Sequence, residues 1–323
     1  MITWREFLAA LGGAAAWPLA ARAQVPRIGF LGAASPSSYA TQLEAFRLGL
    51  RDLGYVEGTN LIIEYRWAQG KYERLRELAA ELVRSNVDVV VTHGTPGALA
   101  AKQATAAIPI VVILIGDPVA AGIVPSLARP GGNVTGQSFF SPELAAKRIE
   151  LLKDSVPQMT RVAVLLNPGN PVVMGAELKA METASQSLKV ELQQVLVRDP
   201  NELERAFERM QQGSVAAVAI SEDSMLIANI RAIAAAATKW RFVSIGNKEF
   251  AQAGGLMGYG VDYFTTYRRS AVFVDRILKG AKPADIPIEQ ATKFHFVMNL
   301  KTAKALGIDI PTSLLVRADE VIE

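Results

Sequence analysis

The chain has 323 residues, 50% of them hydrophobic, with a formal net charge of +3 and no cysteine. The lack of cysteine excludes disulfides, thiolate nucleophiles, cysteine-based zinc sites and a lipid-anchored N-terminal cysteine. Lys and Arg are spread along the chain, without a basic run. The charge pattern therefore gives no support to nucleic-acid binding.

The first 23 residues have the pattern of a secretory signal peptide. Arg5 precedes an apolar, small-residue run that is too short to span a bilayer as a helix. Ala21-Arg22-Ala23 then supplies the small side chains that signal peptidase requires. We predict cleavage after Ala23 and a periplasmic mature chain that does not insert into the membrane. The export route stays open, because Trp4 stands where a twin-arginine signal would have its first arginine.

Beyond the signal peptide, short β-rich runs alternate with helical periodicity, which indicates βαβ units and a parallel sheet. The strands are nearly continuous apolar runs, as expected where helices cover both faces of a sheet. The predicted strands are 28–31, 61–65, 87–92, 110–115 and 134–139, then 162–166, 190–197, 215–220, 242–245 and 255–259. The predicted helices are 41–53, 72–84, 95–105, 143–155, 172–188, 201–211, 225–239 and 262–279, before an extended run at 292–298 and a short C-terminal helix.

The two series of strands have similar architecture. Arg27–Leu31 opens the first and Arg161–Leu165 opens the second, and each leads through a loop of small and polar residues into a long helix. One sheet of about ten strands is the alternative, but domains of this size usually split. The sequence therefore predicts an α/β protein with two doubly wound parallel-sheet lobes and a ligand cleft between them.

The candidate ligand-binding residues follow from the place of the loops. Ligands of open α/β sheets bind beyond the carboxyl ends of the strands. In this chain the loops at those ends are small and polar. The candidates are Ser35, His93, Thr95, Pro96, Asp117, Val119, Asn167, Glu222, Asn247 and Tyr259.

Ser35 and Thr95 lead among them, because each places a hydroxyl at a helix start, where unpaired N–H groups favour a carboxylate or phosphate. Both also fit a role as N-caps of their own helices. Asp117, Glu222 and Asp223 are placed to receive an ammonium group, although acids are common in first helical turns. Tyr259 lies among glycines and is a candidate to contact ligand, and an ordinary buried tyrosine fits the same pattern.

Motifs of catalysis are missing from the sequence. It contains no G-x-G-x-x-G after the first strand, no P-loop and no G-x-S-x-G elbow. The two histidines, His93 and His295, lie in strand patterns that favour structural roles, and no group of residues has metal-ligand spacing. Acids are plentiful in the loops, but nothing selects an acid–base pair. We expect no enzyme activity, no catalytic residue, no metal and no cofactor.

Several runs, in order along nearly the whole chain, carry a family resemblance. They are 5–7 and 12–24 in the signal peptide, then GYVEG at 54–58, EYRWA at 64–68, GTPGALAAK at 94–102, RPGGNVTG at 129–136, AGGLM at 253–257 and NLKTA at 299–303. The chain resembles ABC-transporter substrate-binding proteins of the family that includes a streptococcal tryptophan-binding lipoprotein. The resemblance implies a type I periplasmic-binding-protein fold with three crossover segments. It also implies discontinuous lobes, 24–138 with 256–290 and 139–255 with 291–323.

The resemblance further implies capture of a small organic ligand by closure of the lobes, and its delivery to the membrane permease of an ABC importer. Most such proteins act as monomers, and we expect a monomer here. The chain departs from the family pattern at Gly258, near Glu222–Met225 and at Asn247-Lys248, so ligand identity is not carried over. We expect an amino-acid-like or aromatic carboxylate. A ligand-sensing domain of a signalling receptor and an α/β enzyme are the alternatives.

Overall fold

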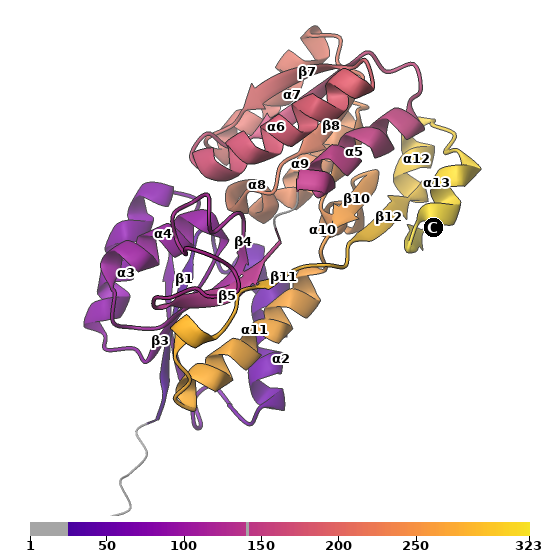
Figure 1. Cartoon of the computed structure of the whole chain (residues 1–323). Coiled ribbons are helices and arrows are strands. Elements are labelled where there is room, and N and C mark those ends of the chain that lie inside the picture. The colour runs from indigo at the N-terminus through magenta and orange to yellow at the C-terminus, as the bar shows by residue number, and fades with distance from the viewer. Residues whose placement is uncertain (1–24, 140–141) are drawn as a thin grey trace, which may run out of the picture.

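The computed structural model describes residues 25–139 and 142–323, and the predicted signal peptide lies outside the described residues. Two α/β lobes lie one above the other, each built on a sheet with helices on its faces (Figure 1). The predicted fold class is thereby confirmed. In the described part of the chain, no helix has the length and apolar character needed to cross a membrane.

The first lobe contains a six-stranded sheet in the order β11-β5-β4-β3-β1-β2. All its pairings are parallel. Its strands are β1 (Arg27–Gly32), β2 (Ile62–Trp67), β3 (Val89–His93), β4 (Ile110–Ile115), β5 (Val134–Ser138) and β11 (Glu289–Gln290). Its helices are η1 (Ser37–Tyr39), α2 (Ala40–Asp52), η2 (Tyr72–Arg74), α3 (Leu75–Arg84), α4 (Gly94–Ala104), α11 (Tyr263–Leu278) and η4 (Pro283–Asp285).

The second lobe contains a seven-stranded sheet in the order β13-β12-β10-β9-β8-β6-β7. One pairing, between β10 and β12, is antiparallel, because the chain enters β12 from the opposite direction. The strands are β6 (Arg161–Leu166), β7 (Glu191–Leu196), β8 (Ala217–Ile220), β9 (Val243–Gly246), β10 (Met257–Gly260), β12 (His295–Asn299) and β13 (Glu320–Ile322). The helices are α5 (Pro142–Ser155), α6 (Pro171–Ser187), η3 (Pro200–Glu202), α7 (Leu203–Gln212), α8 (Ser224–Ala228), α9 (Ile230–Lys239), α10 (Lys248–Gln252), α12 (Leu300–Leu306) and α13 (Thr312–Arg317).

The helix predicted at 225–239 is two helices in the structure, α8 and α9. Asn229 separates them, and its side-chain amide donates to the Met225 carbonyl at 2.8 Å. An asparagine side chain that bonds nearby backbone competes with continuous helix. The short elements α10, β11 and β13 were not predicted, because runs of two to five residues show no periodicity.

Among the elements of residues 25–139 and 142–323, the chain passes from one lobe to the other between β5 and α5, between β10 and α11, and between β11 and β12. The predicted boundary near residue 256 falls too early. Met257–Gly260 pairs with β9 and β12 in the second sheet, so the chain leaves the second lobe only after Gly260. The other domain limits stay predictions.

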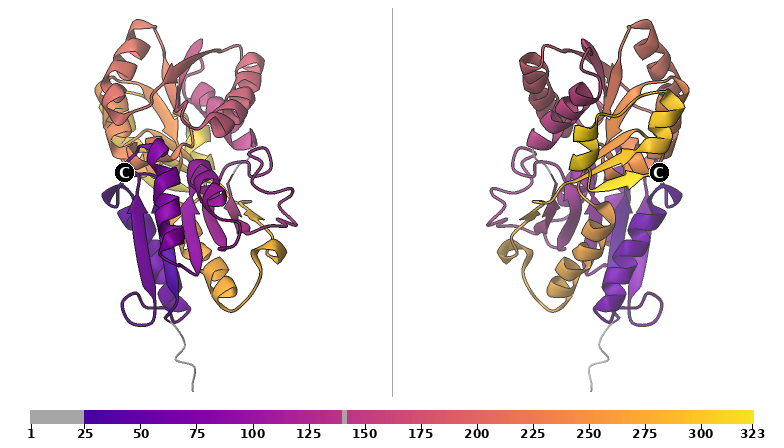
Figure 2. Two further views of the ribbon diagram at one scale, coloured as in Figure 1. Left: turned by 90° about the vertical axis from the view of Figure 1, so that its left-hand side faces the viewer. Right: turned by 90° about the vertical axis from the view of Figure 1, so that its right-hand side faces the viewer.

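The segment that returns to the first lobe packs against its beginning. Helix α11 lies beside α2, although the two are far apart in the sequence (Figure 2). The helices meet at Gly49, where an added Cβ would lie 2.2 Å from the Arg268 carbonyl oxygen. Only glycine allows this approach. Tyr263, Tyr267 and Phe273 of α11 thereby join the hydrophobic core of the first lobe.

Candidate ligand-binding site

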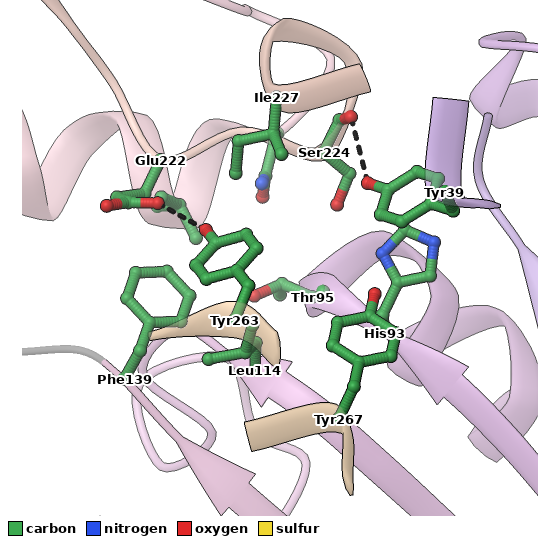
Figure 3. A pocket seen from close by; sticks show the side chains of 13 residues that line it. Tyr39, His93, Thr95, Leu114, Phe139, Glu222, Ser224, Ile227, Tyr263 and Tyr267 are labelled. Carbon is green, nitrogen blue, oxygen red and sulfur yellow. Dashed lines mark hydrogen bonds between the residues drawn. The ribbon is translucent and has the colours of Figure 1, made fainter. Parts of the chain in front are cut away.

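A small cavity lies between the two lobes (Figure 3). Its volume is about 20 Å³, which is room for about one water molecule. The first lobe contributes Tyr39, His93, Gly94, Thr95, Leu114, Phe139, Tyr263 and Tyr267 to its wall, and the second contributes Asn170, Val173, Glu222, Ser224 and Ile227. The lobes therefore meet in direct contact around a site that combines aromatic rings with polar groups.

Two tyrosines of the first lobe donate hydrogen bonds across the cavity. The Tyr263 hydroxyl donates to Oε2 of Glu222 at 2.5 Å, and the Tyr39 hydroxyl donates to the Ser224 carbonyl at 3.1 Å. Glu222 belongs to the loop that follows β8 in the second lobe, and Ser224 begins the helix α8 that comes after this loop. The loop is therefore the place where the second lobe meets the tyrosines of the first.

A third tyrosine contacts the same loop outside the cavity. The Tyr72 hydroxyl lies 3.0 and 3.1 Å from the carboxylate oxygens of Asp223. Amide groups of Asn167 and Asn170 donate to the same carboxylate at 2.9 and 3.3 Å. Burial raises the pKa of Asp223, and the hydrogen bonds from Asn167 and Tyr72 oppose that effect. Asp223 is thus held by its own lobe and contacted by the other.

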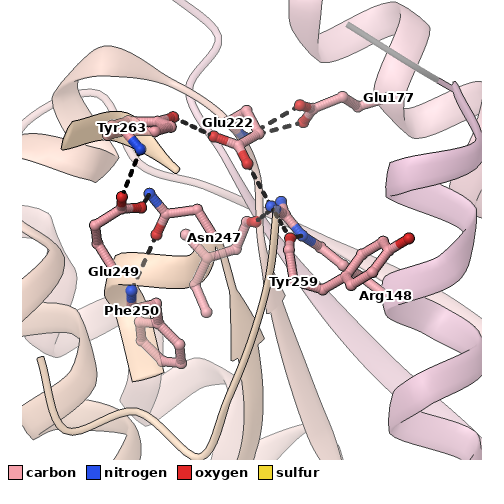
Figure 4. A network of polar contacts seen from close by, with 9 residues as sticks. Arg148, Glu177, Glu222, Asn247, Glu249, Phe250, Tyr259 and Tyr263 are labelled. Atoms are coloured by element: carbon pink, nitrogen blue, oxygen red, sulfur yellow. Dashed lines mark hydrogen bonds and ion pairs between the residues drawn. The ribbon is translucent and has the colours of Figure 1, made fainter. Parts of the chain in front are cut away.

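Glu222 has partners on both of its carboxylate oxygens (Figure 4). Arg148 of α5, itself fully buried, forms an ion pair with Oε1 and also donates to the carbonyls of Tyr259 and Ile220. Oε2 accepts from Tyr263. A buried carboxylate is tolerated where an opposite charge and hydrogen bonds compensate its lost hydration. Glu222 therefore carries a fixed negative charge at the cavity wall.

Two further glutamates, the buried Glu177 and the half-buried Glu249, flank this pair (Figure 4). Glu177 accepts from the Glu222 backbone N–H at 3.1 Å, and Glu249 accepts from the Tyr263 backbone N–H at 2.9 Å. Burial is the main reason that the pKa of each rises to about 8, and the negative charge of Glu222 adds to the effect. Both carboxyls are thus mainly protonated at neutral pH.

His93 is a neutral side chain in the cavity wall. Its Nε2 accepts from the Ala33 backbone N–H at 3.2 Å, which assigns the ring proton to Nδ1. Burial lowers the pKa of His93 to about 3. The ring packs against Tyr39 with 4.2 Å between the ring centroids. His93 therefore offers a neutral N–H donor rather than a positive charge.

Tyr267 offers a second unused polar group. Its ring is 1% exposed, and its hydroxyl, directed toward the cavity in Figure 3, has no hydrogen-bond partner among the described residues. A buried polar group without a partner costs free energy, so this hydroxyl is suited to contact a ligand.

Three of the predicted ligand residues, His93, Thr95 and Glu222, line the cavity together. Thr95 Oγ1 accepts from the Gly116 backbone N–H at 3.3 Å, and so ties the start of α4 to the loop after β4. These three side chains were predicted from their position at the carboxyl ends of strands, and the structure places them together. Their role in binding stays a prediction.

The other predicted residues lie outside the cavity wall. Several serve their own loops: Ser35 bonds Ser37 and Ser38, Asp117 accepts from the N–H groups of Val119 and Ala120, and Asn247 caps α10. Val119 is 45% exposed, and Pro96 is half-buried beside the cavity in α4. Asn167 holds Asp223, and the Tyr259 ring lies against Phe294 with centroids 6.0 Å apart.

Most of the aromatic wall was not predicted from the sequence. Tyr263 and Tyr267 are four residues apart at the start of α11, and this spacing places them on one face of a helix. That spacing was an available signal, but the return of α11 to the cleft was not readable from it. Tyr39 ends η1, close to Ser35 in the sequence, and Phe139 directly follows β5.

A family model described as ABC transporter substrate binding protein matches residues 32–322. The chain belongs to this family. It is 26% identical over 266 residues, 82% of this chain and 76% of the relative, to the tyrosine-binding protein of Clostridioides difficile strain R20291. This is a family of solute-binding proteins rather than of enzymes.

Solved structures of substrate-binding proteins and related domains share the fold. A conserved domain protein from Vibrio cholerae has a TM-score of 0.85 at 27% identity, with 92% of this chain and 100% of that chain covered. The ABC domain from Streptococcus pneumoniae in complex with L-Trp has a TM-score of 0.82 at 26% identity, with 91% and 100% covered. The likeness confirms the family predicted from the sequence runs.

Proposed function

We propose that this protein captures an amino acid with an aromatic side chain, or a related carboxylate, and delivers it to the permease of an ABC importer. The observation that supports it best is the cavity between the lobes, whose wall combines the rings of Tyr39, Tyr267 and Phe139 with polar groups from both lobes. Two relatives point to the same ligand class, one called a tyrosine-binding protein and the other solved in complex with L-Trp.

The wall suits the two ends of an amino acid. The ligand carboxylate would lie near the start of the 11-residue helix α4, with the His93 Nδ1–H and the Tyr267 hydroxyl as neutral donors. Glu222 supplies the negative charge that a ligand ammonium group would face. Aromatic side chains of the wall would stack on the ligand ring.

Entry of such a ligand requires the lobes to move apart. A cavity of about 20 Å³ is far smaller than the pockets that hold small organic molecules, which are roughly 300 Å³ or larger. Closure around ligand is favoured only if the ligand binds the closed form more tightly than the open form. A wall built from both lobes meets this condition.

The proposal includes export. The first 23 residues would be removed after Ala23, and the mature protein would act as a monomer in the periplasm, without turning over its ligand. N-terminal sequencing of the periplasmic fraction tests the cleavage site, and size-exclusion chromatography tests the monomer.

The deciding experiment is a thermal-shift screen of the chain that begins at Gln24 against L-tyrosine, L-tryptophan, aromatic acids, short peptides and nucleosides. A ligand at 100-fold excess over its Kd stabilises the native state by about 2.7 kcal/mol. Stabilisation by an aromatic amino acid, without turnover of that compound, is the expected result. Stabilisation by another class alone, or turnover, would overturn the proposal.

A further inference from the structure

Tyr72 joins the two lobes without touching the ligand cavity. It begins η2 in the first lobe, and its ring packs against hydrophobic clusters of both lobes. Its hydroxyl donates to the Asp223 carboxylate at 3.0 Å and accepts from the Met225 backbone N–H at 2.9 Å. Tyr72 is not among the residues of the cavity wall.

The contact lies on the side of the cleft away from the crossing segments. Tyr72 follows β2, which is the edge strand of the first sheet, while β5 and β11, next to the crossings, form the opposite edge. Figure 1 shows the same separation, with α3 on one side of the molecule and β11 on the other. Rotation of the lobes about the crossings separates contacts at the far side most, so the Tyr72 bonds break early on opening.

The acceptor stays in place when the lobes separate. Asp223 is bonded within its own lobe by Asn167, Asn170 and the N–H of Met225. Opening therefore removes the Tyr72 bonds and leaves the rest of the Asp223 network intact. The Tyr72 contact thus belongs to the closed arrangement alone.

We propose that Tyr72 is a positioning residue that stabilises the closed lobes at the mouth of the cleft, and so sets the affinity for ligand without selecting which ligand binds. The inference rests on the proposed binding function. An interaction made only in the closed form raises affinity for every ligand that closes the lobes by the same factor.

The test is the Tyr72→Phe substitution, which removes the hydroxyl and keeps the ring. Titration calorimetry with L-tyrosine and L-tryptophan is expected to show a rise in Kd of about tenfold for both, at an unchanged ratio between them. Stopped-flow kinetics should place the loss in a faster dissociation rate. Unchanged affinity, or a changed ratio between the two ligands, would overturn the proposal.

Tyr55→Phe is the matched control. Its hydroxyl also donates to an aspartate, Asp275, at 3.0 Å, but both residues belong to the first lobe. Tyr55→Phe also removes a tyrosine hydroxyl that donates to an aspartate, but within one lobe, so its affinity for ligand should equal that of wild type. An equal loss in both variants would show an effect on folding of the first lobe instead.

A measurement without ligand separates this inference from the function it rests on. The chain has no cysteine, so Glu77→Cys on α3 and Glu208→Cys on α7 give one spin label on each lobe at exposed positions. Tyr72→Phe is expected to shift the distance distribution toward longer separations. If neither amino acid binds the wild-type protein, the proposed ligand class fails, and this shift still decides whether Tyr72 holds the lobes together.

Discussion

The Tyr263 hydroxyl donates a 2.5 Å hydrogen bond to Glu222 across the cleft, between a helix of the first lobe and a loop of the second. Glu222 is at the same time paired with Arg148, which is buried in its own lobe. The charge at the cavity wall is therefore held from both sides. Opening removes the Tyr263 partner and leaves the Arg148 pair.

Loss of Arg148 should strongly destabilise the second lobe. Arg148→Met leaves the Glu222 carboxylate buried without a cation, which typically costs about 3 to 5 kcal/mol. Urea unfolding at pH 7 measures the change. Lys239→Met is the control, because Lys239 and Glu204 form an exposed pair worth about 1 kcal/mol or less. Similar losses in the two variants would contradict a structural role for the buried pair.

Glu177 should make the protein less stable as the pH rises. Its pKa is raised from 4.5 to about 8, so between these values the folded chain binds more protons than the unfolded chain. This stability is fully present below about pH 4.5 and is lost as the pH rises through about 8. Glu177→Gln stays neutral, and its melting temperature should fall less than that of wild type between pH 6 and pH 9.

The comparison needs an exposed glutamate as a control. Glu208→Gln on α7 should retain the wild-type change of melting temperature with pH. If Glu177→Gln retained it as well, the carboxyl would be charged throughout this range.

Tyr267→Phe should separate binding from stability. Its hydroxyl has no partner among the described residues, so its removal should not lower the free energy of unfolding. If the ligand takes that hydroxyl as a partner, Kd for the aromatic amino acid found in the screen should rise about tenfold. Calorimetry of the variant beside Tyr259→Phe, whose ring lies outside the cavity wall, measures this. A larger loss of affinity in Tyr259→Phe than in Tyr267→Phe would show that Tyr259, and not Tyr267, contacts the ligand.

Gly49→Ala should destabilise the first lobe, because the added Cβ would lie 2.2 Å from the Arg268 carbonyl oxygen of α11. Overpacking of this kind costs about 1 to 3 kcal/mol. Gly175→Ala in α6 is the opposite case, since no atom lies within 4 Å of its added Cβ, and it should stabilise by about 0.5 to 1 kcal/mol. Thermal unfolding should show a lower melting temperature than wild type for Gly49→Ala and a higher one for Gly175→Ala.

The sequence was sufficient for the fold because its signals are local. Apolar runs such as Ile110–Ile115 and the helix after each of them need no knowledge of distant residues. The cavity residues His93, Thr95 and Glu222 followed from the same logic, since each comes at or just after the end of a strand.

The rest of the site depends on contacts between distant parts of the chain. Tyr267 reaches the cavity because α11 returns to the first lobe. The family resemblance implied that return, but the residue pattern did not show that Tyr267 would face the second lobe. Ser35 and Asp117 have hydroxyl and carboxylate groups suited to a ligand, but neighbouring backbone N–H groups occupy them. Sequence patterns do not distinguish these uses of the same side chain.

The late return of α11 also bears on the order in which the protein folds. The apolar face of α2 is completed by Tyr267 and Phe273, and the first sheet gains β11 only at Glu289. On the ribosome, the first lobe therefore cannot finish folding until nearly the whole chain has been made, while β6 to β10 can already assemble. Contacts of such long sequence separation slow folding. Both lobes thus depend on the last part of the chain, the first for β11 and the second for β12 and β13, which follow β11 in the sequence.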